Sequence, residues 1–388
     1  MYKKMTESRY SGLNMTGIKS ANRAMLLQYI FEHGGASRKT LAETLGLTPA
    51  AITQITRPML EEGLLVEAGS PAAGEGQMSA GPAEQPESNE APKRAGRHQV
   101  QLALNPAYGL VLCVNVGVDT TDISVCSLWG ELQRTVSVET ASHAAPGDFL
   151  DRIIGLGRQL LADEEHGIPL RAVSIGIVGE VDRARGISRH AYGIWDKEVD
   201  PASAFKEAFG VPVIVENNVR SFAMAELLFD DCKAYDSLLV VKWGPGVGST
   251  IILKKEIYEG SLAAAGEIGH MIAEPGGKKC TCGRRGCLET VVGAAALKEH
   301  ESAYIDYAFD TLARAIVNEM TILDPDRVVL YGDFFGDKKM REGVLSLIAS
   351  YDESYLSRIA STGLSDREAY IGPAAEAVSA FIRGDVEA

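Results

Sequence analysis

One histidine and three cysteines lie close together in residues 265–289, which read AGEIGHMIAEPGGKKCTCGRRGCLE. The spacing His270-x9-Cys280-x-Cys282-x4-Cys287 offers one imidazole and three thiols, and the intervening glycines let the backbone curl until all four reach one point. Such a set predicts a tetrahedral zinc site. A disulfide is disfavoured because Cys280 and Cys282 are too close for an easy bridge. The alternative is a glycine-rich turn with free thiols.

Four protein ligands leave no open position for water, so the predicted zinc is structural and not catalytic. We expect one ion per chain. Its role would be to fix the loop that carries Glu267, His270 and Glu289.

The chain that must position this loop alternates strand-like and helix-like segments from Gly109 onward. This order predicts an α/β body with a mixed sheet, in two lobes. Strands are expected at residues 110–116, 122–128, 172–178, 213–215, 237–241, 250–253 and 327–330, and helices at 148–163 and 311–323.

The N-terminal part has a different pattern. A helix-like segment at residues 20–33 is followed by a short helix capped by Ser37 and by a third helix that starts at Thr48-Pro49. A short strand follows at residues 64–66, which completes the order of a winged helix-turn-helix. We expect Pro58 to kink or end the third helix. The alternative is a helical bundle used for dimerisation.

The outward face of the third helix carries small residues that allow close approach to the major groove, with a glutamine and an arginine that can contact base edges. We expect Gln54 to read bases and Arg57 to contact phosphate. The predicted DNA-binding residues are Ser37, Arg38, Thr48, Ala50, Ala51, Thr53, Gln54 and Arg57.

Residues 68–95 have almost no large apolar side chains, which predicts a disordered excursion at the wing tip. Lys93, Arg94 and Arg97 at its base could then contact phosphates. An inert linker has the same composition and is the alternative.

The net charge of −14 over 388 residues is unevenly distributed. Residues 1–60 hold eight Lys and Arg and three Glu, a net charge of +5, which leaves −19 for the remainder and suggests a small basic module on an acidic body. The chain has neither a long apolar run nor an apolar N-terminal core, so we expect it to be cytoplasmic. Cys113, Cys126 and Cys232 are interpreted as core residues of a reduced compartment.

At these residues the chain resembles the ROK family, which groups sugar kinases with sugar-responsive transcriptional repressors. The resemblance implies a winged helix-turn-helix DNA-binding domain at residues 1–105 and a two-lobed, actin-like (ribonuclease-H-like) sugar-binding domain at 106–388. It also implies that Asn217, Glu267, His270 and Glu289 hold sugar hydroxyls. Carboxylates accept from hydroxyls, and a histidine bound to zinc through one nitrogen offers the other.

The chain departs from the family's kinases at three places. The family's phosphate hairpin reads Asp-x-Gly-Gly-Thr, whereas this chain has Asn115-Val116-Gly117-Val118-Asp119. Val118 adds a branched side chain and Asp119 adds negative charge near phosphate. The catalytic Asp position holds Asn218, whose amide cannot take a proton from a hydroxyl, and the turn expected near the adenosine is bulky at residues 330–334.

These observations predict a DNA-binding transcriptional regulator, with no catalytic residues, whose kinase-like body binds a sugar without phosphorylating it. We expect a repressor that acts as a homodimer, or a dimer of dimers, on a double-stranded DNA operator. The rivals are a ROK-type sugar kinase with an accessory DNA-binding domain, and a scaffold with a vestigial sugar cleft. The sequence does not identify the sugar.

Overall fold

The computed structural model describes residues 15–67, 100–140, 145–162, 167–261, 264–299 and 302–386. These residues divide into two compact units. Unit 1 comprises the described residues up to Leu110 together with Ser127–Trp129 and the residues from Val378 onward, and unit 2 comprises Val111–Cys126 and Gly130–Ala377. The segment 68–95, with Lys93, Arg94 and Arg97, lies outside the described residues. Over the ranges that are described, no helix is both long and apolar enough to cross a membrane.

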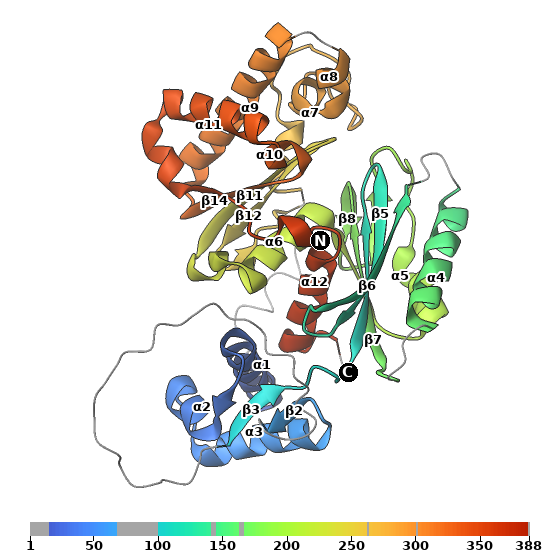
Figure 1. The fold of residues 1–388 in the computed structure, drawn as a ribbon, viewed down its shortest axis with the longest axis vertical. Helices are drawn as coiled ribbons and strands as arrows, with labels where there is room; N and C mark the ends of the chain where they lie inside the picture. The colour runs from blue at the N-terminus through green and yellow to red at the C-terminus, as the bar shows by residue number, and fades with distance from the viewer. Residues whose placement is uncertain are drawn as a thin grey trace, which may run out of the picture. The chain divides into compact units, whose positions relative to one another are not determined.

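Unit 1 combines helices with a small antiparallel sheet (Figure 1). Its elements are α1 (Met15–His33), β1 (Ala36–Ser37), α2 (Arg38–Leu45), α3 (Pro49–Glu61), β2 (Leu65–Glu67) and β3 (Gln101–Leu104), with the strands in the order β1-β3-β2. Ser37 and Thr48 cap α2 and α3 through their side-chain oxygens, as their positions predict. Helix α3 continues past Pro58 to Glu61. Proline removes the bond to the Gln54 carbonyl, and both residues are exposed, so water can replace the missing amide.

The core of unit 1 is aliphatic at its centre and aromatic at one end. Its central side chains are fully buried: Leu26, Ile30, Leu41, Ile52, Leu64 and Leu102. At the aromatic end, Phe381 of α12 (Ile371–Arg383) packs with its ring centroid 5.9 Å from Tyr108 and 5.7 Å from Trp129. The Arg23 guanidinium of α1 lies 5.4 Å from the same ring. Residues near the end of the sequence therefore belong to the unit that begins it.

The first sheet of unit 2 has the strand order β10-β7-β4-β5-β6. The strands are β4 (Leu110–Val116), β5 (Thr120–Ser127), β6 (Leu132–Glu139), β7 (Leu170–Ile177) and β10 (Val213–Asn217). Helices α4 (Pro146–Ala162) and α5 (Pro201–Phe209) lie along one side of it, and α6 (Asn218–Phe229) follows β10 (Figure 1). Cys113 on β4, Cys126 on β5 and Cys232 after α6 are buried and free, as predicted. A hairpin of β8 (Glu180–Asp182) and β9 (Ile187–His190) extends beyond β7.

The second sheet of unit 2 has the order β13-β12-β11-β14-β15. Its strands are β11 (Ser237–Trp243), β12 (Val247–Leu253), β13 (Glu256–Ile257), β14 (Arg327–Tyr331) and β15 (Ile359–Ser361). Apolar side chains of β11 and β14 pack against α9 (Ser302–Leu323) and α11 (Lys338–Tyr351) in one buried cluster. The short helices α7 (Glu289–Val292), α8 (Ala294–Glu299) and α10 (Asp333–Gly336) complete this part. The expected α/β body is confirmed, and the structure divides its strands between two five-stranded sheets.

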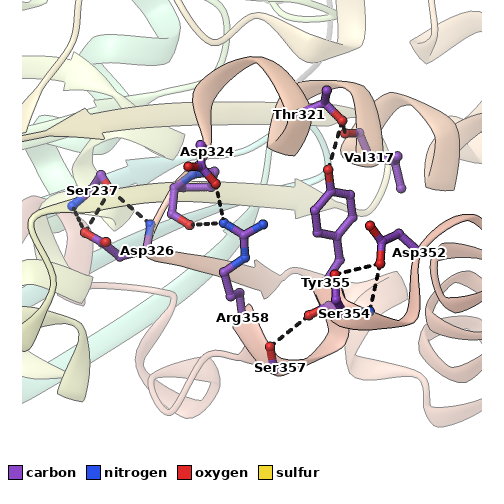
Figure 2. A network of polar contacts seen from close by, with 11 residues as sticks. Ser237, Val317, Thr321, Asp324, Asp326, Asp352, Ser354, Tyr355, Ser357 and Arg358 are labelled. Carbon is purple, nitrogen blue, oxygen red and sulfur yellow. Dashed lines mark hydrogen bonds and ion pairs between the residues drawn. The ribbon is translucent and has the colours of Figure 1, made fainter.

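A polar network fixes the connection from α9 into β14 (Figure 2). The Asp326 carboxylate accepts from the amide and hydroxyl of Ser237, at 2.9 and 2.8 Å, and these bonds lower the pKa of Asp326. Arg358 donates to Asp324 at 2.7 Å, and the Tyr355 hydroxyl lies 3.0 Å from that of Thr321. The start of β14 is thereby tied to the start of β11, its parallel neighbour in the sheet.

Candidate functional site

The four predicted metal ligands come together, with their ligand atoms all within 4.8 Å of one another. The Sγ atoms of Cys282 and Cys287 are 3.6 Å apart, and the Sγ of Cys280 lies 3.6 Å from Nδ1 of His270. A tetrahedral ion with Zn–S bonds of about 2.3 Å separates neighbouring sulfurs by about 3.8 Å. The donor types and their spacing fit zinc, so these residues form a cluster that could hold a metal ion, hereafter the His–Cys cluster.

A short hairpin brings the ligands of the His–Cys cluster together. Lys279 and Arg285 form an antiparallel bridge, and the Cys280 amide donates to the Arg284 carbonyl at 2.8 Å. Gly286 has a φ of 73°, and a Cβ there would collide with the backbone carbonyl of Glu274. Only glycine satisfies both conditions, so the backbone of the hairpin depends on this position.

The second ring nitrogen of His270 faces away from the thiols. Its Nε2 lies 3.3 Å from the Tyr192 hydroxyl, which donates to the Glu180 carboxylate at 3.2 Å. A metal on Nδ1 would leave the ring proton on Nε2, so Nε2–H would donate to the tyrosine oxygen and the tyrosine O–H to the carboxylate. The hydrogen-bond chain therefore joins the His–Cys cluster to the β8–β9 hairpin.

These groups border a cavity of about 610 Å³ in unit 2, a volume within the range of small-molecule sites. Val181, Ile268 and Met271 provide apolar contact. The polar side chains that line it are Glu180, Arg189, Tyr192, Glu267, His270, Arg284 and Glu319. Such a lining suits a ligand with several hydroxyls.

Of the four side chains expected to hold a sugar, Glu267 and His270 line the cavity, whereas Glu289 and Asn217 lie outside its lining. Burial is the main cause that raises the pKa of Glu267, and it raises the pKa of Glu289 to about 6. The Glu289 carboxylate accepts a hydrogen bond from the Val247 amide and begins α7. Of the two predicted carboxylates, Glu267 and Glu289, the structure therefore places Glu267 at the cavity.

Asn217 has a structural role that the sequence did not predict. Its Oδ1 accepts from the amides of Val219 and Arg220, at 2.8 and 3.2 Å, and so caps α6. Its Nδ2 donates to the Gly179 carbonyl at 2.8 Å. The amide can therefore no longer both donate and accept freely, because only one N–H remains beyond these bonds.

A buried ionic network holds Asn217 in place from behind. The Glu216 side chain is 1% exposed, and its carboxylate accepts from the backbone N–H of Asn217 at 2.7 Å and from Arg183 at 2.9 Å. Arg183 also pairs with Glu376 of α12 at 2.9 Å. Because each charge has an opposite partner, this network can remain buried and fix the start of α6 rigidly.

The residues predicted to replace the phosphate hairpin of kinases, 115–119, lie at the end of β4 and in the turn to β5. Val118 and Asp119 are exposed at this turn, and the Gly117 amide donates to the Thr120 carbonyl at 2.9 Å. Across the unit, Lys242 of β11 pairs with Glu368 at 2.6 Å, and the buried Tyr331 ring stacks on Phe222 at 3.9 Å. Large side chains and an ion pair therefore lie beside Tyr331, in the turn at residues 330–334.

On unit 1, the predicted DNA-binding residues fall into two groups. Ala50, Thr53, Gln54 and Arg57 are exposed on α3, together with the cap Thr48, while Ala51 and Arg38 are half-buried. Arg57 pairs with Glu61 at 2.8 Å and Arg38 with Glu67 at 3.4 Å. Ser37 is 2% exposed, and its hydroxyl accepts from the Thr40 amide as the cap of α2. Its assignment as a DNA contact stays a prediction.

Sequence reasoning missed five polar residues of the cavity: Glu180, Arg189, Tyr192, Arg284 and Glu319. Arg284 lies inside the predicted hairpin and could have been included on that ground. The other four come from the β8–β9 region and from α9, which the fold brings to the His–Cys cluster. No local spacing in the sequence connects these segments.

Comparison with known proteins finds a family match within each of the two units. Residues 111–303 match the model of the ROK family, and residues 20–66 match that of a winged helix-turn-helix DNA-binding domain. The xylose repressor of Bacillus subtilis (strain 168) is 27% identical over 304 residues, covering 76% of this chain and 72% of that protein. The N-acetylglucosamine repressor of Escherichia coli O157:H7 is 29% identical over 287 residues, covering 74% and 66%.

Solved structures agree on the fold. A ROK family transcriptional regulator, described as a homolog of the Escherichia coli MLC protein, superimposes with a TM-score of 0.74 at 21% identity, over 95% of this chain and 98% of that one. A ROK family glucokinase from Streptomyces griseus, in complex with glucose and AMPPNP, gives 0.56 at 23% identity, over 69% and 98%. The chain therefore contains a ROK family domain at residues 111–303, with a winged helix-turn-helix ahead of it at residues 20–66.

Proposed function

We propose that this protein is a sugar-responsive DNA-binding transcriptional regulator, and specifically a repressor, whose ROK body binds a sugar without phosphorylating it. The observation that carries the proposal is the presence, in one chain, of an exposed α3 face in a winged helix-turn-helix and a cavity lined by carboxylates and other polar side chains beside the His–Cys cluster. The names of the xylose and N-acetylglucosamine repressors favour repression over activation. A regulator of transcription acts where the DNA is, so the proposal places this protein in the cytoplasm.

In this proposal one zinc ion per chain is held by His270, Cys280, Cys282 and Cys287. With four protein ligands it has a structural role. Glu267 accepts from sugar hydroxyls, and Nε2–H of His270 donates to a sugar hydroxyl in exchange for its bond to Tyr192. Glu180 joins them from the β8–β9 hairpin. Asn217 and Glu289 remain candidate contacts, since one has an amide N–H left and the other a second carboxylate oxygen.

Three features support binding without phosphoryl transfer. Asp119 brings negative charge to the β4–β5 turn, which opposes a bound phosphate. Asn218 stands where the base would be needed, and an amide cannot accept the hydroxyl proton. Tyr331 and the Lys242–Glu368 pair take up space near the expected adenosine turn. A kinase with an accessory DNA-binding domain is the rival function, and the turnover experiment in the Discussion separates the two.

We further propose that residues 1–105 and 106–388 act as the DNA-binding and sugar-binding domains, and that the chain works as a homodimer or a dimer of dimers. A single small helix-turn-helix gives little specific affinity, and two copies related by a two-fold axis read an inverted repeat. Sugar binding would then change the spacing of the two reading helices against fixed half-sites.

The direct test of this function is the effect of sugar on DNA affinity. DNA selected by the protein from a randomised pool, labelled with a fluorophore, should bind about 5–150-fold more weakly in saturating effector sugar, which corresponds to about 1–3 kcal/mol of coupling. Fluorescence anisotropy measures the affinity, and the L-enantiomer of the sugar is the control. Equal DNA affinity with every sugar of a broad panel would contradict the proposal and favour a constitutive scaffold.

Substitutions on α3 should separate base reading from phosphate attraction. Gln54→Ala should weaken binding of the selected DNA by about 1–3 kcal/mol and relax the sequence preference, because it removes a base contact. Arg57→Ala should weaken the binding of DNA of every sequence. It should also lower, by about one, the slope of log affinity against log salt concentration. Lys206→Ala removes one exposed charge from unit 2 and serves as the control. Unchanged sequence preference in the Gln54 variant would remove that residue from the reading face.

A further inference from the structure

Three carboxylates of the cavity lie beyond ion-pair distance of the basic residues that the structure describes. Glu180, Glu267 and Glu319 form no ion pair within 4.0 Å to any residue that the structure describes. Two of them accept from neutral hydroxyls: Tyr192 donates to Glu180 at 3.2 Å and Ser249 to Glu319 at 3.4 Å. The third, Glu267, has its pKa raised by burial, while the more distant charges of Arg220 and Arg284 act in the opposite direction. Three acceptors with negative charge therefore face the same space.

The two arginines of the cavity do not balance these carboxylates, because each has an anionic partner of its own. Arg189 pairs with Asp182 at 2.7 Å. Arg284 is hydrogen-bonded to the Cys282 sulfur, which belongs to the His–Cys cluster and becomes a thiolate when it binds metal. A Zn2+ ion with three thiolates and a neutral histidine has a net charge of −1, which Arg284 balances, so the three carboxylates leave the charge around the cavity negative.

We propose that the cavity selects an unphosphorylated sugar, neutral or carrying an amine, and rejects sugar phosphates. This inference rests on the proposed function, since it specifies the ligand class of the same site. The hydroxyls of a neutral sugar donate to carboxylates, whereas a phosphate dianion is repelled by them. A like charge within about 7 Å in a partly screened cleft weakens binding by about tenfold or more.

Glu319 is the carboxylate best suited to test the selection. It projects from α9, outside the His–Cys hairpin, so a change there leaves the metal ligands in place. Burial raises the pKa of Glu319 to about 7, so this carboxyl is mostly ionised at pH 8. A phosphate ester is a dianion at the same pH.

Calorimetry on the full-length, zinc-loaded protein at pH 8 provides the experiment. The probes are xylose, and two matched pairs: glucose with glucose 6-phosphate, and N-acetylglucosamine with its 6-phosphate. For at least one pair the free sugar should bind at least about tenfold more tightly, and the gap should narrow as salt is raised from 0.05 to about 0.5 M. In Glu319→Gln the ratio of the two affinities should fall several-fold. Glu353→Gln, an exposed change of the same charge, should leave that ratio as it is.

The outcomes distinguish this inference from the function on which it rests. A phosphate ester that binds as tightly as its parent sugar, or a Glu319→Gln variant with an unchanged ratio, would overturn the charge selection while the sugar site itself stands. Failure of all five probes to bind, by calorimetry and by thermal shift, would remove the proposed sugar site and the selection with it.

Discussion

Replacing Cys282 with serine is expected to release the metal and to remove the sugar response with it. Serine is not deprotonated at neutral pH, so the site would keep three ligands and its metal affinity should fall by more than about 100-fold. Cys282 is chosen because it is only partly buried, whereas Cys280 and Cys287 belong to the core. Elemental analysis should then find well under one zinc per chain, and the sugar-induced shift in Tm should vanish because the backbone that carries Glu267 is no longer fixed.

Lys279→Gln is the matched control, since it changes an exposed side chain of the same hairpin that is not a metal ligand. It should retain about one zinc per chain and a normal sugar response. Wild-type protein purified without chelator that contains no metal would contradict the zinc assignment. A Cys282→Ser variant that lost zinc and still bound sugar normally would separate the metal from the site.

The second large effect concerns catalysis. Typical kinases turn over at about 1–100 s⁻¹, and the purified protein should form no sugar phosphate from ATP at a rate approaching this range. An ADP-coupled assay with the same sugars checks this, and a ROK glucokinase run in parallel shows that the assay responds. Sustained turnover with one sugar would establish the kinase alternative and end the binding-only proposal.

Asn218→Asp tests whether the residue at this position alone accounts for the proposed lack of turnover. We expect no measurable kinase activity from this variant, because Asp119 would still repel phosphate at the β4–β5 turn and Tyr331 would still fill the adenosine side. Sugar affinity, measured by calorimetry, confirms that the variant is folded. Turnover gained by this single change would mean that the phosphate site is intact.

Much of the fold could be predicted where a pattern is local. The strand expected at 110–116 is β4, and those expected at 213–215 and 327–330 lie within β10 and β14. Helix α6 was not predicted because it is buried on most of its surface, so it has no polar face to reveal a helical period. The edge strand β6 was also missed, since its polar sequence LQRTVSVE has few buried side chains.

The candidate site divides in the same way. The His–Cys cluster could be predicted because three of its ligands lie in one hairpin and the metal chemistry restricts their types. Tyr192 and Glu319 are separated by more than a hundred residues, so their meeting at one cavity depends on the packing of two sheets. Asn217 was assigned from its chemistry alone, which could not indicate that its oxygen caps a helix.

The position of Phe381 has a consequence for synthesis on the ribosome. This residue packs on Tyr108 and Trp129 and lies against Arg23, all within unit 1, yet it is translated more than 250 residues later than Tyr108 and Trp129. Domains generally fold as their residues emerge, N-terminal ones first. Here the aromatic end of the unit 1 core stays incomplete until the codons of α12 have been translated. A nascent chain that ends before α12 therefore carries unit 1 without Phe381, and its aromatic cluster forms only after the strands of both sheets of unit 2 have been made.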